Sequence, residues 1–212
     1  MSNESFFSVP KLAISKGVIY PGAEQRLARF CQLFDGDQVE LFLAIRNPAT
    51  FFPAVFAQTP TEDFLDFMDG ADPRHLSWSE LIPRLRSVVP QVAITIWCNE
   101  DTPLIWAQLI RELAGLEHNT KITGGFDLLS DIMTAEGMKR FRAYLKDHPS
   151  MNEMQKRRVI AAFLDKFAKE DELEEVVDLP GWTEDLIDSL SELYDEDVFQ
   201  ISRIPGVSMI TP

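Results

Sequence analysis

The stretch Val39–Phe56, VELFLAIRNPATFFPAVF, decides the fold. It opens with five apolar residues without alternation, Leu41–Ile45, which is typical of a strand buried on both faces of a helix-covered parallel sheet. Pro48 has no N–H to donate to a ladder, so the strand ends at Asn47 at the latest. Arg46 is therefore predicted at the carboxyl end of a central strand, the edge at which open α/β sheets bind ligands.

The same alternation of strand and helix continues along the first half of the chain. We predict a helix over Tyr20–Phe34, a second buried strand over Val92–Trp97, and a helix from Thr102 to Gly115. Capping boxes predict two more helix starts, at Thr59-Pro60-Thr61-Glu62 and at Ser77-Trp78-Ser79-Glu80. Helices between similar apolar strands indicate an α/β fold, a parallel sheet flanked by helices.

The second half of the chain reads as all-helical, because no strand pattern follows Gly124-Gly125. Helices are predicted over 134–148, 150–169 and 183–204, the second of them opened by a capping box from Ser150 to Glu153. The acidic run Glu170–Asp178 is predicted as a solvated helix end rather than a metal site. We predict one α/β domain over residues 1–212, with a sheet-bearing part (1–122) and an all-helical C-terminal portion (123–212).

Composition and charge narrow the range of partners. The net charge of −14 over 212 residues disfavours nucleic acid and anionic membranes, which require a basic surface. The first residues lack the pattern of a signal peptide, and no uncharged stretch is long enough to span a bilayer. Cys31 and Cys98 are predicted as reduced thiols of a cytoplasmic protein, with a disulfide between them as the alternative.

At Arg46-Asn47-Pro48 the chain resembles the sulfotransferase family, a branch of the P-loop nucleotide-binding fold. In that family a buried strand ends in Arg-Asn/Asp-Pro and runs into a helix. The Arg holds the 3′-phosphate of the sulfuryl donor, 3′-phosphoadenylyl sulfate. A guanidinium suits this task because its planar fork donates two charge-assisted hydrogen bonds to phosphate oxygens.

A second segment extends the resemblance over about Pro21 to Leu116. Residues 94–101, followed by a helix ending in Leu113-Ala114-Gly115-Leu116, are similar to the family's strand, Glu-Asp, helix, Leu-Gly-Leu segment. The resemblance implies a P-loop NTPase-like, sulfotransferase-type fold. It implies that Arg46 binds the cofactor, 3′-phosphoadenylyl sulfate or its product adenosine 3′,5′-bisphosphate, with Thr50 offering a nearby hydroxyl. No metal is implied.

Two departures from the family pattern bear on activity. The serine that follows the Arg by eight residues in the family is Ala54 here. The phosphosulfate-binding loop is not found: Gly17 and Gly22 have the spacing of its glycines, but Ala23-Glu24 follow where Lys-Ser/Thr is needed. One expectation is that the intact protein carries about 70 further residues upstream, by typical element sizes, and transfers a sulfuryl group to a hydroxyl or amine of a small-molecule acceptor. The alternative is a catalytically inactive protein on the same fold that dimerises or docks a partner.

Several other side chains keep two interpretations. Arg46 either contacts phosphate or pairs with Glu100 or Asp101, and those acids are otherwise predicted to cap a helix. The basic cluster Lys156-Arg157-Arg158 is either a phosphate contact or a solvated helix face. An aromatic group is either core or groove lining, or a partner-binding face: Phe51, Phe52, Phe56, Phe64 and Phe67. The three histidines, His75, His118 and His148, are predicted as solvated loop residues.

Overall fold

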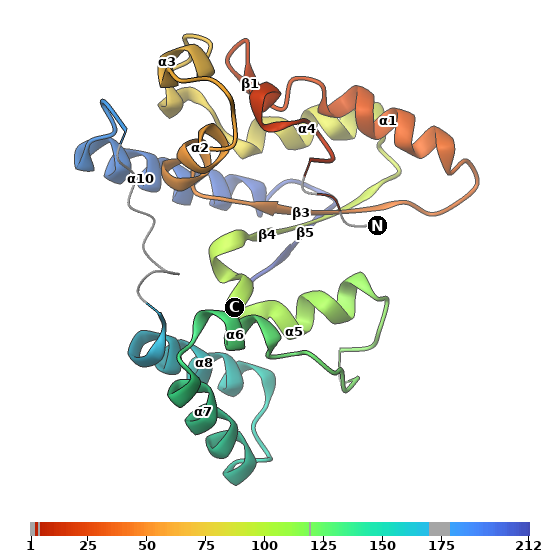
Figure 1. Ribbon diagram of the computed structural model, residues 1–212. Coiled ribbons are helices and arrows are strands. Elements are labelled where there is room, and N and C mark those ends of the chain that lie inside the picture. Colours follow the sequence, from red (N-terminus) through yellow and green to blue (C-terminus); the bar gives the residue numbers. More distant parts are fainter. Residues whose placement is uncertain (1–2, 4, 119, 170–178) are drawn as a thin grey trace. The chain divides into compact units, whose positions relative to one another are not determined.

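The computed structural model describes residues 3, 5–118, 120–169 and 179–212 (Figure 1). The chain divides into two units. Unit 1 comprises Met1–Ile96 with Val177–Met209, and unit 2 comprises Trp97–Val176 with Ile210–Pro212. The boundary between the units differs from residue 122, at which the sequence pattern predicts that a sheet-bearing part gives way to a helical part.

A three-stranded parallel sheet has the order β3-β4-β5. Strand β4 is therefore the central one, and the prediction that Arg46 follows a central strand is wrong, because β3 lies at the edge. Strands β3 (Glu40–Ile45) and β4 (Ala93–Cys98) lie where the two apolar runs predict them. Strand β5 (Val207–Ile210) makes the prediction of an all-helical second half wrong. It was missed because four residues with one buried side chain, Ile210, are too short to show a period. The fold is therefore α/β, and the chain returns to the sheet near its last described residue.

Four helices of unit 1 pack together over one face of the sheet (Figure 1). They are α1 (Ala23–Leu33), α2 (Pro48–Phe56), α4 (Trp78–Val88) and α10 (Glu184–Ile201). Where the sequence predicts a boundary for one of these helices, the observed boundary lies within three residues of it. Their inward side chains are fully buried together with those of the strands, among them Leu27, Phe52, Leu81, Leu85, Ile94 and Ile96. Burying each such side chain contributes roughly 1.5–3 kcal/mol.

Shorter elements complete unit 1. They are η1 (Pro10–Leu12), the antiparallel pair β1 (Ile14–Ser15) and β2 (Val18–Ile19), α3 (Phe64–Phe67) and η2 (Pro73–His75). The helix predicted to start at Thr59 is wrong. The Thr59 hydroxyl donates to the carbonyl of Phe56 at 2.8 Å and so closes the end of α2. The next helix, α3, begins instead where the Asp63 carboxylate accepts from the N–H of Leu65 at 2.7 Å.

Unit 2 is built from helices around its own core. After η3 (Asn99–Asp101) come α5 (Thr102–Leu113), α6 (Asp127–Ile132), α7 (Ala135–Asp147) and α8 (Glu153–Phe167). Their core consists of Leu129, Met133, Met138, Phe141 and Ile160. The start of α8 corrects the sequence analysis, because Asn152 and Gln155 form the capping box in place of Ser150 and Glu153. The predicted solvated helix end, Glu170–Asp178, lies outside the described residues.

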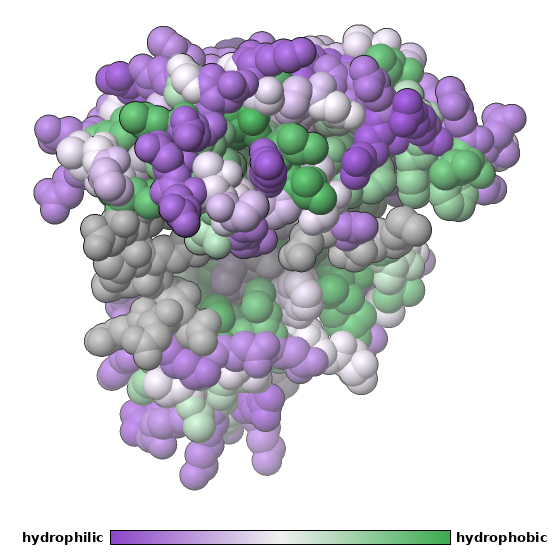
Figure 2. All heavy atoms as spheres, turned by 45° about the horizontal axis from the view of Figure 1, so that its top comes forward, coloured by the Kyte–Doolittle hydropathy of each residue, from purple (hydrophilic) through white to green (hydrophobic). Residues whose placement is uncertain are grey.

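Two further predictions concern cysteines and membranes. Cys31 and Cys98 are thiols rather than a disulfide. Among the helices of the described ranges, none combines the length and the apolar character needed to cross a bilayer. The space-filling view shows hydrophilic and hydrophobic side chains interspersed over the exposed face of unit 1 (Figure 2).

Candidate functional site

The structure brings the two predicted ligand-binding residues, Arg46 and Thr50, into contact. Arg46 directly follows β3, and Thr50 lies in the first turn of α2. The Nε–H of Arg46 donates to Thr50 Oγ1 at 3.0 Å, and the Thr50 hydroxyl donates to the carbonyl of Asn47 at 3.2 Å. This chain of bonds fixes the direction in which the guanidinium leaves the strand.

The motif that carries the family resemblance also has a local structural function. Asn47 is the N-cap of α2, and its Oδ1 accepts from the N–H of Ala49 at 2.9 Å. Pro48 occupies the first helical position, where its missing N–H costs nothing and its fixed φ suits the helix. Asn-Pro is thus a strong helix start directly after a strand, which makes the turn at Arg46 sharp.

Helix α10 secures this turn from a distant part of the chain. The Nδ2 of Asn47 donates to Ser191 Oγ at 3.0 Å, and the Tyr194 hydroxyl donates to the carbonyl of Ile45 at 3.4 Å. Ser191 and Tyr194 are three residues apart and so lie on one face of the helix. Sequence reasoning missed both, because a helix pattern does not indicate which turn its polar side chains will meet.

Two tryptophans satisfy backbone carbonyls on either side of the turn. Trp78 Nε1–H donates to the carbonyl of Arg46 at 2.8 Å, and Trp182 Nε1–H donates to that of Ala49 at 3.0 Å. Buried carbonyls without such partners would be costly. The neighbouring phenylalanines belong to the same packing, which confirms their interpretation as core: Phe51, Phe52 and Phe67 are buried, and the half-buried Phe56 and Phe64 contact Phe67.

The buried carboxylate of Asp197, on α10, takes the capping role predicted for Ser77. Asp197 is 6% exposed and accepts from the N–H of Trp78 at 2.6 Å and from that of Ser79 at 3.1 Å. Ser77 is the N-cap residue of α4 but makes no side-chain capping bond. The sequence held a signal for this, since Asp197 falls on the apolar face of α10 that also carries Leu190, Tyr194 and Ile201.

The side chain of Asp101 does not cap α5 as predicted. Asp101 occupies the N-cap position of α5, but its side chain makes no capping hydrogen bond. Burial, and secondarily the neighbouring charge of Glu100, raises the pKa of the Asp101 carboxyl. Pairing of Arg46 with either acid stays a prediction.

Among the described residues, neither the histidines nor the possible metal ligands form a second candidate site. His75, His118 and His148 are exposed, which confirms the prediction of solvated residues. His148 stacks on Tyr144, with ring centroids 4.2 Å apart. Within the ranges that the structure describes, no three side chains of His, Cys, Asp or Glu gather as they would around a metal ion.

No protein-family model, no curated protein and no solved structure matches this chain. Fold and site define it as an α/β protein whose three-stranded parallel sheet is flanked by helices, with an Arg at the carboxyl end of the edge strand β3. The resemblance to sulfotransferases therefore rests on the two sequence segments alone.

Proposed function

We propose that the chain binds the 3′-phosphate of adenosine 3′,5′-bisphosphate or of 3′-phosphoadenylyl sulfate at the carboxyl end of β3. Arg46 is the phosphate ligand in this proposal. The observation that supports it is the contact of 3.0 Å between Arg46 Nε and Thr50 Oγ1, which holds a guanidinium at the carboxyl end of a strand, the end at which open α/β sheets commonly bind ligands.

The geometry refines the part that Thr50 plays. A hydroxyl has one hydrogen, and that of Thr50 is donated to the carbonyl of Asn47. Thr50 therefore acts as a positioning residue that accepts from Arg46, rather than as a second donor to phosphate. The first N–H groups of α2 are likewise engaged, since those of Ala49 and Thr50 donate to Asn47 Oδ1 and Asn47 O. The phosphate would depend on the charge of Arg46, assisted by the helix dipole.

In the full reaction expected from the resemblance, the sulfuryl group passes in line to a hydroxyl or amine. The bond from sulfur to the donor phosphate oxygen breaks as the bond from sulfur to the acceptor oxygen or nitrogen forms. Adenosine 3′,5′-bisphosphate leaves, and the proton of the acceptor passes to solvent. Arg46 would orient the donor through the 3′-phosphate and would not touch the reacting atoms. The residues described here support this one part of the site, and the catalytic residues stay unknown.

The test is isothermal titration with adenosine 3′,5′-bisphosphate, and with adenosine 5′-monophosphate as the ligand lacking the 3′-phosphate. We expect the bisphosphate to bind more tightly, and Arg46→Ala to weaken it by about 10- to 100-fold, the range for a hydrogen-bonded charge. Arg46→Lys keeps the charge but loses the fork, so it should restore only part of the affinity. Thr50→Val should reduce affinity for the bisphosphate while leaving that for the monophosphate unchanged.

The exposed Arg29, in unit 1, supplies the matched control, because Arg29→Ala removes the same charge from a distant helix face. Equal affinity for the two nucleotides, or an unchanged affinity in Arg46→Ala, would overturn the proposal. The alternative, a catalytically inactive interaction protein on the same fold, then becomes the better hypothesis, and self-association would be measured next.

A further inference from the structure

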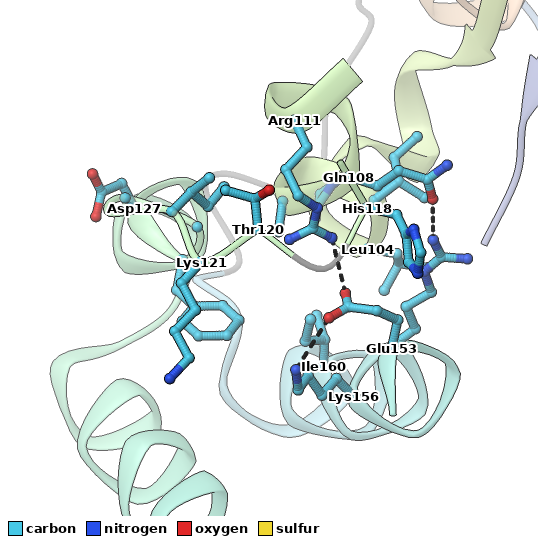
Figure 3. A pocket seen from close by; sticks show the side chains of 18 of the residues that line it. Leu104, Gln108, Arg111, His118, Thr120, Lys121, Asp127, Glu153, Lys156 and Ile160 are labelled. Carbon is cyan, nitrogen blue, oxygen red and sulfur yellow. Dashed lines mark hydrogen bonds and ion pairs between the residues drawn. The ribbon is translucent and has the colours of Figure 1, made fainter. Parts of the chain in front are cut away.

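Unit 2 contains a cavity of about 550 Å³, enclosed by α5, α8 and the segment that leads into α6 (Figure 3). This volume falls within the roughly 300–1,000 Å³ typical of small-molecule sites. All of its lining residues belong to unit 2. The residues that line it include four with apolar side chains, Leu104, Ile105, Phe126 and Ile160, beside charged ones.

The charge of the cavity is opposite to that of the whole protein. The chain has 20 Lys and Arg against 34 Asp and Glu. The cavity wall reverses this ratio, with five cationic side chains against two carboxylates: Arg111, Lys121, Arg142, Lys156 and Arg157 against Asp127 and Glu153. An excess of positive side chains within one cavity of an acidic protein favours an anionic ligand there, because low-dielectric walls strengthen the local electrostatic potential.

Arg111 is the buried centre of this charge. Its side chain is 8% exposed, and Figure 3 shows its guanidinium pointing from α5 toward Glu153 on α8. The only ion pair that Arg111 makes within the described residues joins its Nη2 to Glu153 Oε2 at 3.3 Å. Its Nε is enclosed and has no hydrogen-bond partner in the described part of the chain. A buried guanidinium with so few acceptors is costly unless another acceptor is supplied.

Glu153 cannot neutralise its surroundings alone. Its carboxylate also accepts from Lys156 Nζ at 3.1 Å, so one negative charge serves two cations. Burial by itself would raise the pKa of Glu153, but Lys156 and Arg111 outweigh it and hold that pKa below its ordinary value. The carboxylate is therefore fully ionised near neutral pH, and the three-residue cluster still keeps one positive charge.

Two further cationic side chains, Arg157 and Arg142, have neutral partners. Arg157 donates to the side-chain oxygen of Gln108 and, at 3.0 Å, to the carbonyl of Thr211. Arg142 donates to Ser130 Oγ at 3.4 Å. Neither contact neutralises the arginine, so the side chains that line the cavity keep their excess of positive charge.

We propose that this cavity binds a small organic anion. Its carboxylate or phosphate group would contact Arg111 and Lys156, and its apolar body would lie against Leu104 and Ile160. This site is separate from the proposed nucleotide site, which is built from unit 1, and the proposal does not depend on it.

The experiment uses the full chain with its isoleucine δ1 methyl groups labelled for NMR. The probes are phenyl phosphate and phenylacetate, which share an apolar ring but differ in the anionic group, and benzyl alcohol as the uncharged analogue. Ile105, Ile122 and Ile160 line the cavity, whereas Ile45, Ile94 and Ile96 belong to unit 1 and serve as internal controls. We expect saturable shifts of the cavity methyls with at least one of the two anions and not with benzyl alcohol.

Variants then test the charge. Arg111→Gln should weaken binding about 10- to 100-fold, as expected for a buried hydrogen-bonded charge. Lys156→Gln, on a side chain that is one-third exposed, should weaken binding about two- to fivefold and should not disturb folding. Arg140→Gln is the matched control, because Arg140 is an exposed arginine of unit 2 that pairs with Glu136 outside the cavity.

The proposal is overturned if neither anion shifts the cavity methyls at 10 mM, or if benzyl alcohol shifts them equally. It is also overturned if Arg140→Gln weakens binding as much as Lys156→Gln does, since the effect would then be one of net charge. If Arg111→Gln loses the dispersed methyl spectrum, Lys156→Gln decides the result.

Discussion

Replacing Asp197 by Ala tests how far unit 1 depends on one buried carboxylate. The side chain accepts from two backbone N–H groups at the start of α4, at 2.6 and 3.1 Å. Asp197→Ala removes the acceptor of both N–H groups, and that of Trp78 belongs to a residue that is only 1% exposed. Helix α4 also loses a negative charge near its N-terminus, which is the positive end of the helix dipole.

The magnitude follows from these losses. A helix cap is worth about 0.5–2 kcal/mol, a hydrogen bond to a charged group about 1.5–3 kcal/mol, and the charge–dipole term about 0.3–1 kcal/mol. These contributions overlap, and removing a buried charge recovers part of its desolvation cost. We therefore expect Asp197→Ala to lower the unfolding free energy of unit 1 by about 3 kcal/mol, mainly through the two orphaned donors. Asp197→Asn keeps one acceptor oxygen and should cost about half as much.

Native-state hydrogen exchange is the suitable assay, because a chain of two units has no single unfolding free energy. A loss of about 3 kcal/mol accelerates exchange about 150-fold at amides that open only by unfolding. The amide of the buried Leu85 reports on unit 1, and that of Phe141 reports on unit 2 as the internal control. Asp195→Asn, an exposed acid on the same helix, should change neither amide by more than about twofold.

Ser77→Ala makes the test decisive. The sequence pattern assigns the cap of α4 to Ser77, whereas in the structure its hydroxyl makes no capping bond. We expect Ser77→Ala to change stability by less than about 0.5 kcal/mol. An acceleration of less than fivefold in Asp197→Ala, or an equal effect of Ser77→Ala, would refute the assignment of the cap to Asp197.

Two further predictions concern close packing and alkaline pH. Gly137→Ala should destabilise unit 2 by about 1–3 kcal/mol despite the better helix propensity of Ala, because its Cβ would lie 2.4 Å from Cβ of Phe167. Native-state hydrogen exchange at the amide of Phe141 would measure this, and an unchanged exchange rate would contradict it. Burial raises the pKa of Tyr20 to about 12 from an ordinary 10.0. As pH rises, Tyr20 therefore ionises in the unfolded chain before it ionises in the folded one. The stability that neutral Tyr20 contributes is lost as pH rises from 10 toward 12. Urea titrations across this range should show the loss in the native protein and less of it in Tyr20→Phe, and equal losses in both would argue against it.

The sequence predicted those strands and helix starts that depend on residues close together in the chain. The apolar runs predicted where β3 and β4 lie, and Asn47-Pro48 and Thr134 start helices in the structure as they do in the pattern. The prediction that the first strand is buried on both faces is wrong, because only Ile45 of β3 is fully buried. Strand β5 and the true caps of α3 and α8 were not predicted. In those helices a neighbouring Asp63 or Asn152 competed with the expected cap, and propensity alone does not rank such neighbours.

The contacts of the candidate site are likewise of two kinds, local ones that the sequence could predict and long-range ones that it could not. Arg46 and Thr50 are four residues apart on a strand–helix turn, so their contact follows from local geometry and was within reach of the sequence. Ser191, Tyr194 and Asp197 act on segments more than 100 residues away, and no periodicity specifies such a pairing.

These long-range bonds matter to the proposed function because they act on the turn before any ligand arrives. The carbonyls of Ile45, Arg46 and Ala49 each accept from an aromatic side chain, and Asn47 is bonded both to α2 and to α10. A guanidinium mounted on such a turn loses little further backbone freedom on binding phosphate, so more of the interaction energy appears as affinity. Loosening the turn without touching Arg46 should therefore weaken the binding of a phosphate ligand. Ser191→Ala is a small change of this kind, because it removes the acceptor of Asn47 Nδ2 and otherwise only a hydrogen bond within α10, to the carbonyl of Ile187.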